Sequence, residues 1–359
     1  MQVKRIALLG ATGSIGRQAL EVVARAPGLE LCGLQSGSTP LDALARAHGV
    51  RHVQVGGDPV TLLERCEPDL VLNAIVGFAG VPATLWSLEH GVTLALANKE
   101  SLVAAGELAL VAKAAGGGLL LPVDSEHSAL FQLLEGRDAT TIESIVLTAS
   151  GGPFRGRQRD SLIDVTVREA LAHPTWAMGP KISVDSATLA NKGLELIEAH
   201  WLFDIPYERI EVVVHPTSVV HALARLQDGS LLAHLGHPDM RVPISFALSY
   251  PERPPTPAPR LDLSGLELRF EAPDPGVFPL LELARQAGEQ GGTYPCAYNA
   301  ANEVAVAGFL AGRLGFLEIA ATVADALAAA DGSPARDIDD LVEADLRARH
   351  LAESRLVPA

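Results

Sequence analysis

Short apolar runs alternate with amphipathic stretches through the first third of the chain. The runs are apolar at nearly every position, which is typical of strands in a parallel sheet that helices cover on both faces. They lie at Val3–Leu9, Leu29–Gln35, His52–Val55, Asp69–Ile75 and Val92–Ala97. The stretches between them predict crossover helices at Ser14–Arg25, Leu41–Ala47, Val60–Arg65 and Gly80–His90. This alternation predicts an N-terminal doubly wound α/β sheet.

The pattern changes after about residue 120. Strands are expected at Ile142–Leu147 and Ile210–Val214, an antiparallel pair at Val219–Leu226 and Ser230–Leu235, and one helix from Ser186 to Phe203. Five prolines between Pro251 and Pro259 predict a semi-rigid linker. Helical periodicity then recurs in Pro279–Gln290, Cys296–Leu310, Leu317–Ala330 and Ile338–Leu351. We therefore expect a Rossmann-like domain (1–122), an α+β catalytic domain (123–250), a linker (251–277) and a C-terminal helical bundle (278–359).

Composition narrows the possible partners of the chain. Its 359 residues carry 28 Lys and Arg against 43 Asp and Glu, a net charge of −15 with no basic block, so we expect no nucleic-acid partner. No uncharged apolar segment reaches about 18 residues, so we expect no membrane span. The run Ile6–Leu9 is too short for a signal peptide. Three scattered cysteines fit a reducing cytosol, so we expect a cytoplasmic protein.

The segment Gly10-Ala-Thr-Gly-Ser-Ile-Gly16 follows a strand and opens a helix. That is the setting of a dinucleotide-binding turn, where glycines admit the pyrophosphate and the helix N-terminus offers amide donors. A ligand-free glycine turn is the alternative. The second strand runs into Gln35–Thr39 without the acid that holds the ribose of NAD, which favours NADP.

Two polar segments follow later strands of the predicted parallel sheet. Asn98–Ser101 sits where open α/β sheets bind ligands, although a capped helix start is an equal alternative. Asp124 and Glu126 suit a hard cation such as Mg²⁺ or Mn²⁺. Helix capping by Asp124 or Ser125 is the stronger alternative for that pair taken alone.

Three further segments suit a phosphorylated ligand. Ser150-Gly-Gly152 could cradle an anion or form a simple turn, and His173–Pro180 carries Trp176 and Met178 in a loop suited to a mobile lid or a rigid buried loop. On the helix expected from Ser186, the side chains of Asn191, Lys192 and Glu195 share one face. A plain Lys–Glu surface pair is the alternative there.

These segments together resemble the 1-deoxy-D-xylulose-5-phosphate reductoisomerase family. The matching stretches are GATGSIG, NKESLV, PVDSEHSAL, SGGPF, the block HPTWAMGPKISVDSATLANKGLELIEAHWLF and HPTSVVHALARLQDGS, in order between residues 10 and 230. The long block from His173 to Phe203 is the most specific of them.

The resemblance implies roles for individual residues. It implies divalent-metal ligands at Asp124, Glu126 and Glu195, and phosphate contacts at Ser150, Ser186, Asn191 and Lys192 with His173 close by. It implies substrate contacts at Lys99 and Ser125, catalytic roles for Lys99, Glu126 and His173, and a lid containing Trp176 and Met178. It implies NADPH contacts at Thr12, Gly13, Ser14, Ile15, Gly37, Asn98, Glu100, Gly179 and Met240.

The implied activity is the rearrangement of 1-deoxy-D-xylulose 5-phosphate and its NADPH-dependent reduction to 2-C-methyl-D-erythritol 4-phosphate, an isoprenoid precursor. The implied cofactors are NADPH and Mn²⁺ or Mg²⁺, in a homodimer. Two other hypotheses remain open on the residues: an NADP-dependent semialdehyde dehydrogenase, which needs a nucleophilic cysteine, and a non-catalytic NADP-sensing protein.

Overall fold

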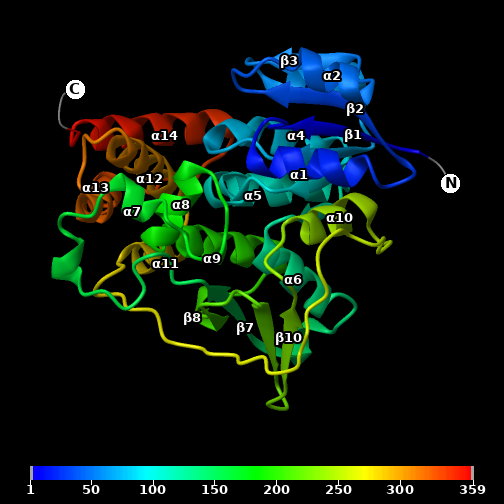
Figure 1. Ribbon diagram of the computed structural model, residues 1–359. Helices are drawn as coiled ribbons and strands as arrows, with labels where there is room; N and C mark the ends of the chain where they lie inside the picture. The colour runs from blue at the N-terminus through cyan, green and yellow to red at the C-terminus, as the bar shows by residue number, and fades with distance from the viewer. Residues whose placement is uncertain (1–2, 357–359) are drawn as a thin grey trace. The chain divides into compact units, whose positions relative to one another are not determined.

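The computed structural model describes residues 3–356, which form two compact units (Figure 1). The first unit comprises the chain up to Leu102, Gly106–Gln132 and Asp239–Arg260, and the second comprises Val103–Ala105, Leu133–Pro238 and the chain from Leu261 onward. The second unit thus includes both the four-stranded sheet and the C-terminal helices. The domain boundaries expected from the sequence remain a prediction.

A six-stranded parallel sheet forms the centre of the first unit. The strands follow the order β3-β2-β1-β4-β5-β6, which is the order of a doubly wound dinucleotide-binding fold. Their bounds are β1 (Lys4–Leu9), β2 (Leu29–Ser36), β3 (His52–Val55), β4 (Leu70–Asn73), β5 (Thr93–Leu96) and β6 (Leu120–Pro122). Strand β4 is buried at every position, as its unbroken apolar run predicts. The expected parallel α/β sheet is confirmed.

Seven α-helices begin in the first unit. They are α1 (Ser14–Val23), α2 (Asp42–His48), α3 (Pro59–Cys66), α4 (Val81–Glu89), α5 (Lys99–Gly116), α6 (Ser125–Leu134) and α10 (Arg241–Ser249). Helix α10 was not expected from the sequence. It returns from the second unit, packs against α1, and adds Ile244, Ala247 and Leu248 to the core under that helix.

The second unit is built on a mixed sheet with the order β10-β9-β7-β8. Strands β7 (Ile142–Ala149) and β8 (Ile210–Val214) are parallel, whereas β9 (Val220–Leu226) pairs antiparallel with both β7 and β10 (Leu231–Leu235). The predicted antiparallel pair is confirmed. The helices are α7 (Val167–Ala170), α8 (Pro180–Ala187), α9 (Ala190–Phe203), α11 (Leu280–Gln290), α12 (Tyr294–Leu310), α13 (Phe316–Ala329) and α14 (Ile338–Glu353).

The single helix expected from Ser186 to Phe203 is wrong, because the chain breaks between α8 and α9. Leu189 adopts a left-handed conformation with φ +60°. The Thr188 hydroxyl donates to the carbonyl of Val184 and accepts from the backbone N–H of Ala190. Threonine can bond the backbone in this way and compete with helix continuation. Neither Gly nor Pro marks the break, so the residue pattern does not indicate it.

The C-terminal helices pack directly on α8 and α9, which connect β7 to β8. Helix α12 contacts α8, α9, α11, α13 and α14, and α11 lies along α9. No regular helix or strand forms between Tyr250 and Pro279 apart from a bridge that pairs Glu271 with Val214. Within residues 3–356, no helix has both the length and the apolar character needed to cross a bilayer.

Candidate active site

The turn after β1 has the backbone geometry of a pyrophosphate-binding turn. Gly10 has φ +76°, and a Cβ on it would lie 2.4 Å from the carbonyl oxygen of Ala74. A Cβ on Gly16 would lie 2.3 Å from the carbonyl oxygen of Gly10, so α1 approaches the strand end as only glycine permits. Gly13 precedes α1 and has no side chain to cap it. The amides of the first turn therefore face outward from an uncapped helix N-terminus.

The predicted cofactor residues of the first unit gather at the ends of β1 and β2. Gly13, Ser14 and Gly37 are exposed, while Thr12 and Ile15 are half-buried. The side chain of Gln35, at the end of β2, accepts a hydrogen bond from the backbone N–H of Gly10 at 3.1 Å. Gln35 thus ties the ends of β1 and β2 together. In an NAD-binding protein, by contrast, the acidic residue at the end of β2 binds the ribose.

Asn98 caps α5 from inside the first unit. Its side-chain amide donates to the carbonyls of Ile75 (2.6 Å) and Gly77 (3.0 Å) and to Glu100 (3.1 Å). Its side-chain oxygen accepts from the backbone N–H of Ser101 at 3.0 Å. The alternative of a capped helix start is therefore confirmed for this segment. A contact from Asn98 to NADPH stays a prediction, and its buried side chain already fixes the turn that would make it.

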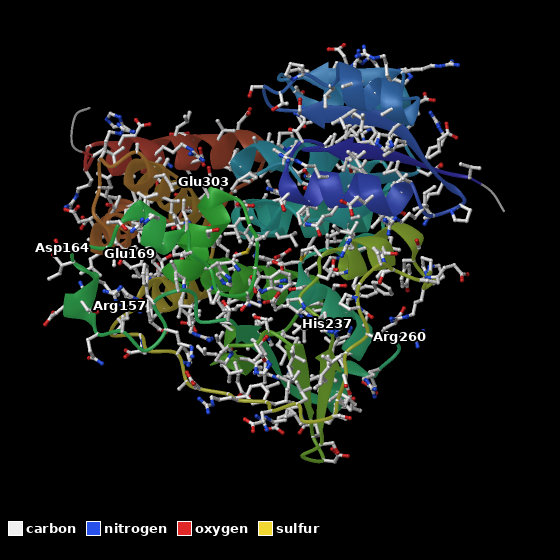
Figure 2. All side chains as sticks on the ribbon, in the orientation of Figure 1. Arg157, Asp164, Glu169, His237, Arg260 and Glu303 are labelled. Atoms are coloured by element: carbon white, nitrogen blue, oxygen red, sulfur yellow. The ribbon has the colours of Figure 1, made fainter. Side chains whose placement is uncertain are left out.

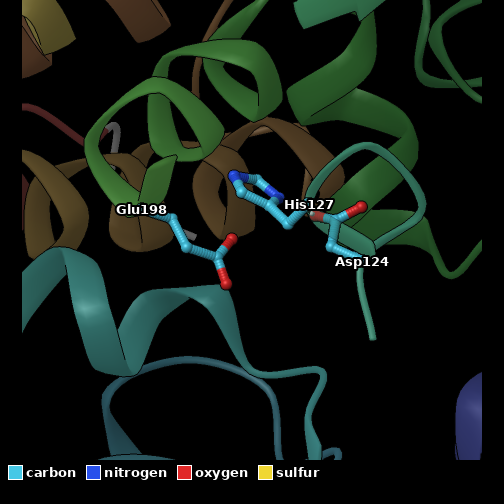
Figure 3. A group of neighbouring side chains, drawn as sticks. All are labelled: Asp124, His127 and Glu198. Carbon is cyan, nitrogen blue, oxygen red and sulfur yellow. Dashed lines mark ion pairs between the residues drawn. The ribbon is translucent and has the colours of Figure 1, made fainter. Parts of the chain in front are cut away.

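Asp124 and Glu126 stand at the junction of β6 and α6 in the first unit. Asp124 Oδ2 lies 2.5 Å from Lys99 Nζ, and His127 Nδ1 lies 3.8 Å from the same oxygen (Figure 3). Ser125 donates its hydroxyl to Glu126. Lys99 opens α5 just after β5, so neighbouring strand ends supply a buried cation and two carboxylates at one edge of the sheet.

In the second unit, the turn after β7 brings Ser150 against the end of α8. Gly151 and Gly152 have φ +84° and +65°, and a Cβ on Gly152 would lie 2.7 Å from the carbonyl oxygen of Ser186. The backbone N–H of Gly152 donates to Ser150 Oγ at 3.2 Å. The two predicted phosphate serines thus belong to segments in direct contact.

The hydrogen bonds of the His173 ring determine which of its nitrogens carries the proton and donates to Ser150. Its Nδ1 accepts hydrogen bonds from the backbone N–H groups of Thr175 (3.1 Å) and Trp176 (2.9 Å). The neutral ring therefore carries its proton on Nε2 and donates it to Ser150 Oγ, 2.8 Å away. Burial lowers the pKa of His173, in agreement with a neutral ring. With these two bonds accepted, the Ser150 hydroxyl proton remains to be donated to a ligand.

The loop that holds Trp176 and Met178 has no regular structure and rests on the mixed sheet. Thr175 Oγ1 donates to the carbonyl of Pro216 at 3.3 Å, and the Trp176 ring lies 6.3 Å from that of His221. Burial lowers the pKa of His221 to about 4. Gly179 ends this loop as the residue before α8.

The first two turns of α9 carry the remaining predicted site residues of the second unit, which are Asn191, Lys192 and Glu195. Asn191 and Lys192 both donate to the carboxylate of Glu195. No acidic residue lies in the first turn of α9, whose N-terminus follows the left-handed residue Leu189. A helix start with Asn and Lys donors and a favourable dipole is suited to an anion. The surface Lys–Glu alternative is wrong, because Lys192 and Glu195 are 3% and 1% exposed.

Comparisons with known proteins cover almost the whole chain. Family models for 1-deoxy-D-xylulose 5-phosphate reductoisomerase match residues 6–59 and 39–106, and models for its C-terminal domains match residues 120–203 and 235–351. The reductoisomerase of Mycobacterium marinum is 50% identical over 99% of this chain and 94% of its own length. That of Leifsonia xyli subsp. xyli is 50% identical over 99% of both chains.

The chain belongs to the 1-deoxy-D-xylulose 5-phosphate reductoisomerase family. Solved members of the family have the same fold. The Zymomonas mobilis enzyme in complex with NADPH has a TM-score of 0.89 and 40% identity over 98% of this chain and 99% of its own. A complex with NADPH, fosmidomycin and magnesium has a TM-score of 0.90 and 37% identity over 98% of both chains.

Sequence reasoning missed three buried polar residues beside the predicted family positions. His127 lies next to Asp124 (Figure 3), His221 lies next to Trp176, and Glu198 lies one turn after Glu195 on α9. The i,i+3 spacing from Asp124 and from Glu195 could have indicated His127 and Glu198. No local signal indicated His221, because its relation to Trp176 depends on the pairing of β9 with β7.

Proposed function

We propose that this chain carries out the reaction of its family with the residues that the sequence indicated. The substrate is 1-deoxy-D-xylulose 5-phosphate, which is rearranged and then reduced by NADPH to 2-C-methyl-D-erythritol 4-phosphate. The observation that carries the proposal is the cluster in the second unit, where Ser150, its partner His173, the end of α8 and the start of α9 present donors and one lysine. These are the groups that a phosphomonoester requires.

The cation would be held by Asp124, Glu126 and Glu195. This donor set is entirely carboxylate oxygen, which suits Mg²⁺ and Mn²⁺ alike. When bound, such a cation polarises the substrate carbonyl and orients its neighbouring oxygens. Lys99, paired with Asp124, supplies a positive charge beside two acids, and Ser125 orients Glu126 through a hydrogen bond. We assign Lys99 and Ser125 to the hydroxyl end of the substrate.

NADPH would lie along the turn after β1 and the end of β2. Its contacts would come from Thr12, Gly13, Ser14, Ile15, Gly37, Asn98, Glu100, Gly179 and Met240. Met240 directly precedes α10 and packs on the core beneath α1, which supports a fixed position for it near the nicotinamide. Trp176 and Met178 would close over the substrate and exclude water.

The metal assignment is tested by Glu195→Gln. This variant keeps an acceptor for Asn191 but removes the charge, so we expect loss of turnover with NADPH affinity within about twofold of wild type. Turnover is followed by NADPH absorbance and NADPH affinity by fluorescence. Glu343→Gln on the exposed face of α14 is the control and should leave both unchanged. Loss of NADPH binding in Glu195→Gln would contradict the metal role.

The cysteines give little support to the alternative hypothesis of a semialdehyde dehydrogenase, which needs a nucleophilic cysteine. Cys32, Cys66 and Cys296 are all buried, and burial raises the pKa of Cys296, which disfavours its reactive thiolate. We expect full reductoisomerase activity after each cysteine is replaced by Ala or Val. A cysteine-dependent loss of activity without loss of folding would favour the dehydrogenase hypothesis instead.

We also propose a homodimer and a cytoplasmic location. Strand β10 ends its sheet with the uncharged run Leu231–Leu235, in which Leu231 is 49% exposed, and a second copy pairing there would cover it. Leu231→Lys should then shift the mass measured by light scattering toward the monomer. Three unpaired thiols are compatible with a reducing compartment, and fractionation of cells would test the location.

A further inference from the structure

Helix α8 carries a buried carboxylate whose partners come from two different helices. Asp185 is 1% exposed. Lys181, one turn earlier on α8, lies with Nζ 2.9 Å from Asp185 Oδ2. The other carboxylate oxygen accepts a hydrogen bond of 2.8 Å from the side-chain amide of Asn302, which comes from α12. A C-terminal helix therefore contributes directly to the partners of this buried charge.

The position of Asp185 links its contact with Asn302 to the residues proposed to bind phosphate. Asp185 immediately precedes Ser186, and the carbonyl of Ser186 is the group that Gly152 approaches. Helix α8 has only eight residues, and so short a helix depends on tertiary contacts for its order. A contact that holds the Asp185 side chain thereby also restrains the Ser186 backbone beside it.

Asn302 itself is held firmly. It is 0% exposed in the middle of α12, a helix with thirteen buried residues among seventeen. Tyr298, one turn earlier, is also fully buried and donates its hydroxyl to the carbonyl of Leu280 at 3.0 Å. Burial, and then the charge of Asp185, raise the pKa of Tyr298. The amide of Asn302 thus projects toward Asp185 from a rigid surface.

We propose that Asn302 is a positioning residue for substrate phosphate, acting through Asp185 to set the end of α8. The inference rests on the proposed role of Ser186 as a phosphate donor. Removing the amide leaves a buried carboxylate with one hydrogen-bond donor fewer, and α8 then shifts or admits water to satisfy it. The phosphate contact weakens, while NADPH, which is assigned mainly to the first unit, is bound as before.

The test compares Asn302→Ala with Asn299→Ala. Asn299 lies one turn earlier on α12 and is equally buried, but its amide donates at 2.8 Å to Glu303 and not to α8. Glu303 is labelled in Figure 2. Both variants should lower the unfolding temperature. Only Asn302→Ala should raise KM for 1-deoxy-D-xylulose 5-phosphate and Ki for inorganic phosphate, by about tenfold each, with KM for NADPH unchanged.

Exchanging the amide and the carboxylate between positions 302 and 185 tests whether the effect on KM can be reversed. Asn302→Asp places two carboxylates together and should raise KM further, whereas Asn302→Asp combined with Asp185→Asn restores one amide and one carboxylate and should recover most of it. If Asn302→Ala does not fold, Asn302→Leu, which fills a similar volume without a donor, is compared with Asn299→Leu in the same way. Equal effects of the Asn302 and Asn299 variants on KM and Ki, or no recovery in the reversed pair, would overturn the inference.

Ser186→Ala distinguishes the positioning role of Asn302 from the phosphate-binding role of Ser186 on which it rests. We expect Ser186→Ala to raise KM for the substrate and Ki for phosphate. If it leaves both unchanged, the phosphate role of α8 is wrong and the inference fails with it. If it raises both while Asn302→Ala behaves like Asn299→Ala, the phosphate assignment stands and the positioning role alone is wrong.

Discussion

The contact between Gly152 and the end of α8 can be tested with a single methyl group. A Cβ at Gly152 would lie 2.7 Å from the carbonyl oxygen of Ser186, against about 3.4 Å for an ordinary contact, a shortfall of about 0.7 Å. That oxygen belongs to backbone, so the turn after β7 and the end of α8 must separate. A hydrogen bond of about 2.9 Å lengthened by that amount is lost.

The size of the expected rise in KM follows from the number of hydrogen-bond donors that the substrate loses. If Ser150 and Ser186 bind the substrate phosphate as proposed, Gly152→Ala displaces one of them from it, and one hydrogen bond to a charged group contributes about 1.5–3 kcal/mol. We therefore expect KM for 1-deoxy-D-xylulose 5-phosphate to rise by roughly 10- to 100-fold. The left-handed conformation adds about 1 kcal/mol of lost stability. KM for NADPH should stay within about twofold of wild type.

Gly156→Ala is the matched control. Gly156 lies in the same loop with φ +78°, but no atom lies within 4 Å of the added Cβ. It should lose the same conformational stability in urea unfolding and keep wild-type kinetics. Steady-state NADPH oxidation with each substrate varied measures both variants. A normal KM in Gly152→Ala, or an equal rise in Gly156→Ala, would refute the reasoning.

Three further predictions concern Gly16, His221 and the requirement for a divalent cation. A Cβ at Gly16 overlaps the carbonyl oxygen of Gly10, so Gly16→Ala should weaken NADPH binding by at least tenfold, measured by fluorescence titration. Burial lowers the pKa of His221 from its ordinary 6.5 to about 4, so the unfolded chain binds the proton first as pH falls through this window. Stability should decline by about 3 kcal/mol between these pH values, and His221→Gln should remove that part of the decline, whereas the same change at the exposed His90 should not. Chelation of divalent cations should stop turnover while NADPH binding persists, and either Mg²⁺ or Mn²⁺ should restore activity; turnover in excess chelator would contradict the roles of Asp124, Glu126 and Glu195.

Features that depend on neighbouring residues were predictable from the sequence. The buried strands follow from unbroken apolar runs, and His52–Val55 and Ile210–Val214 were predicted at their observed bounds. The dinucleotide turn follows from the spacing of Gly10 and Gly16, because that spacing fixes where the chain can turn and where the helix can approach. The Asn98 cap is equally local, since it joins residues three apart.

Tertiary structure decided how these segments combine. The break at Leu189 leaves no mark in the apolar pattern, and α10 returns to the first unit although the preceding strands belong to the second. Asn302 meets Asp185 across 117 residues of chain, and His173 meets Ser150 only because the loop before α8 folds back on the mixed sheet.

The residue types of the site were therefore determined by the sequence alone, whereas the protonation and orientation of His173 and the support of α8 were not. A side chain's chemistry and its local backbone preference reside in a few consecutive residues. The partner of a buried charge is chosen by packing between distant segments, which no local pattern records.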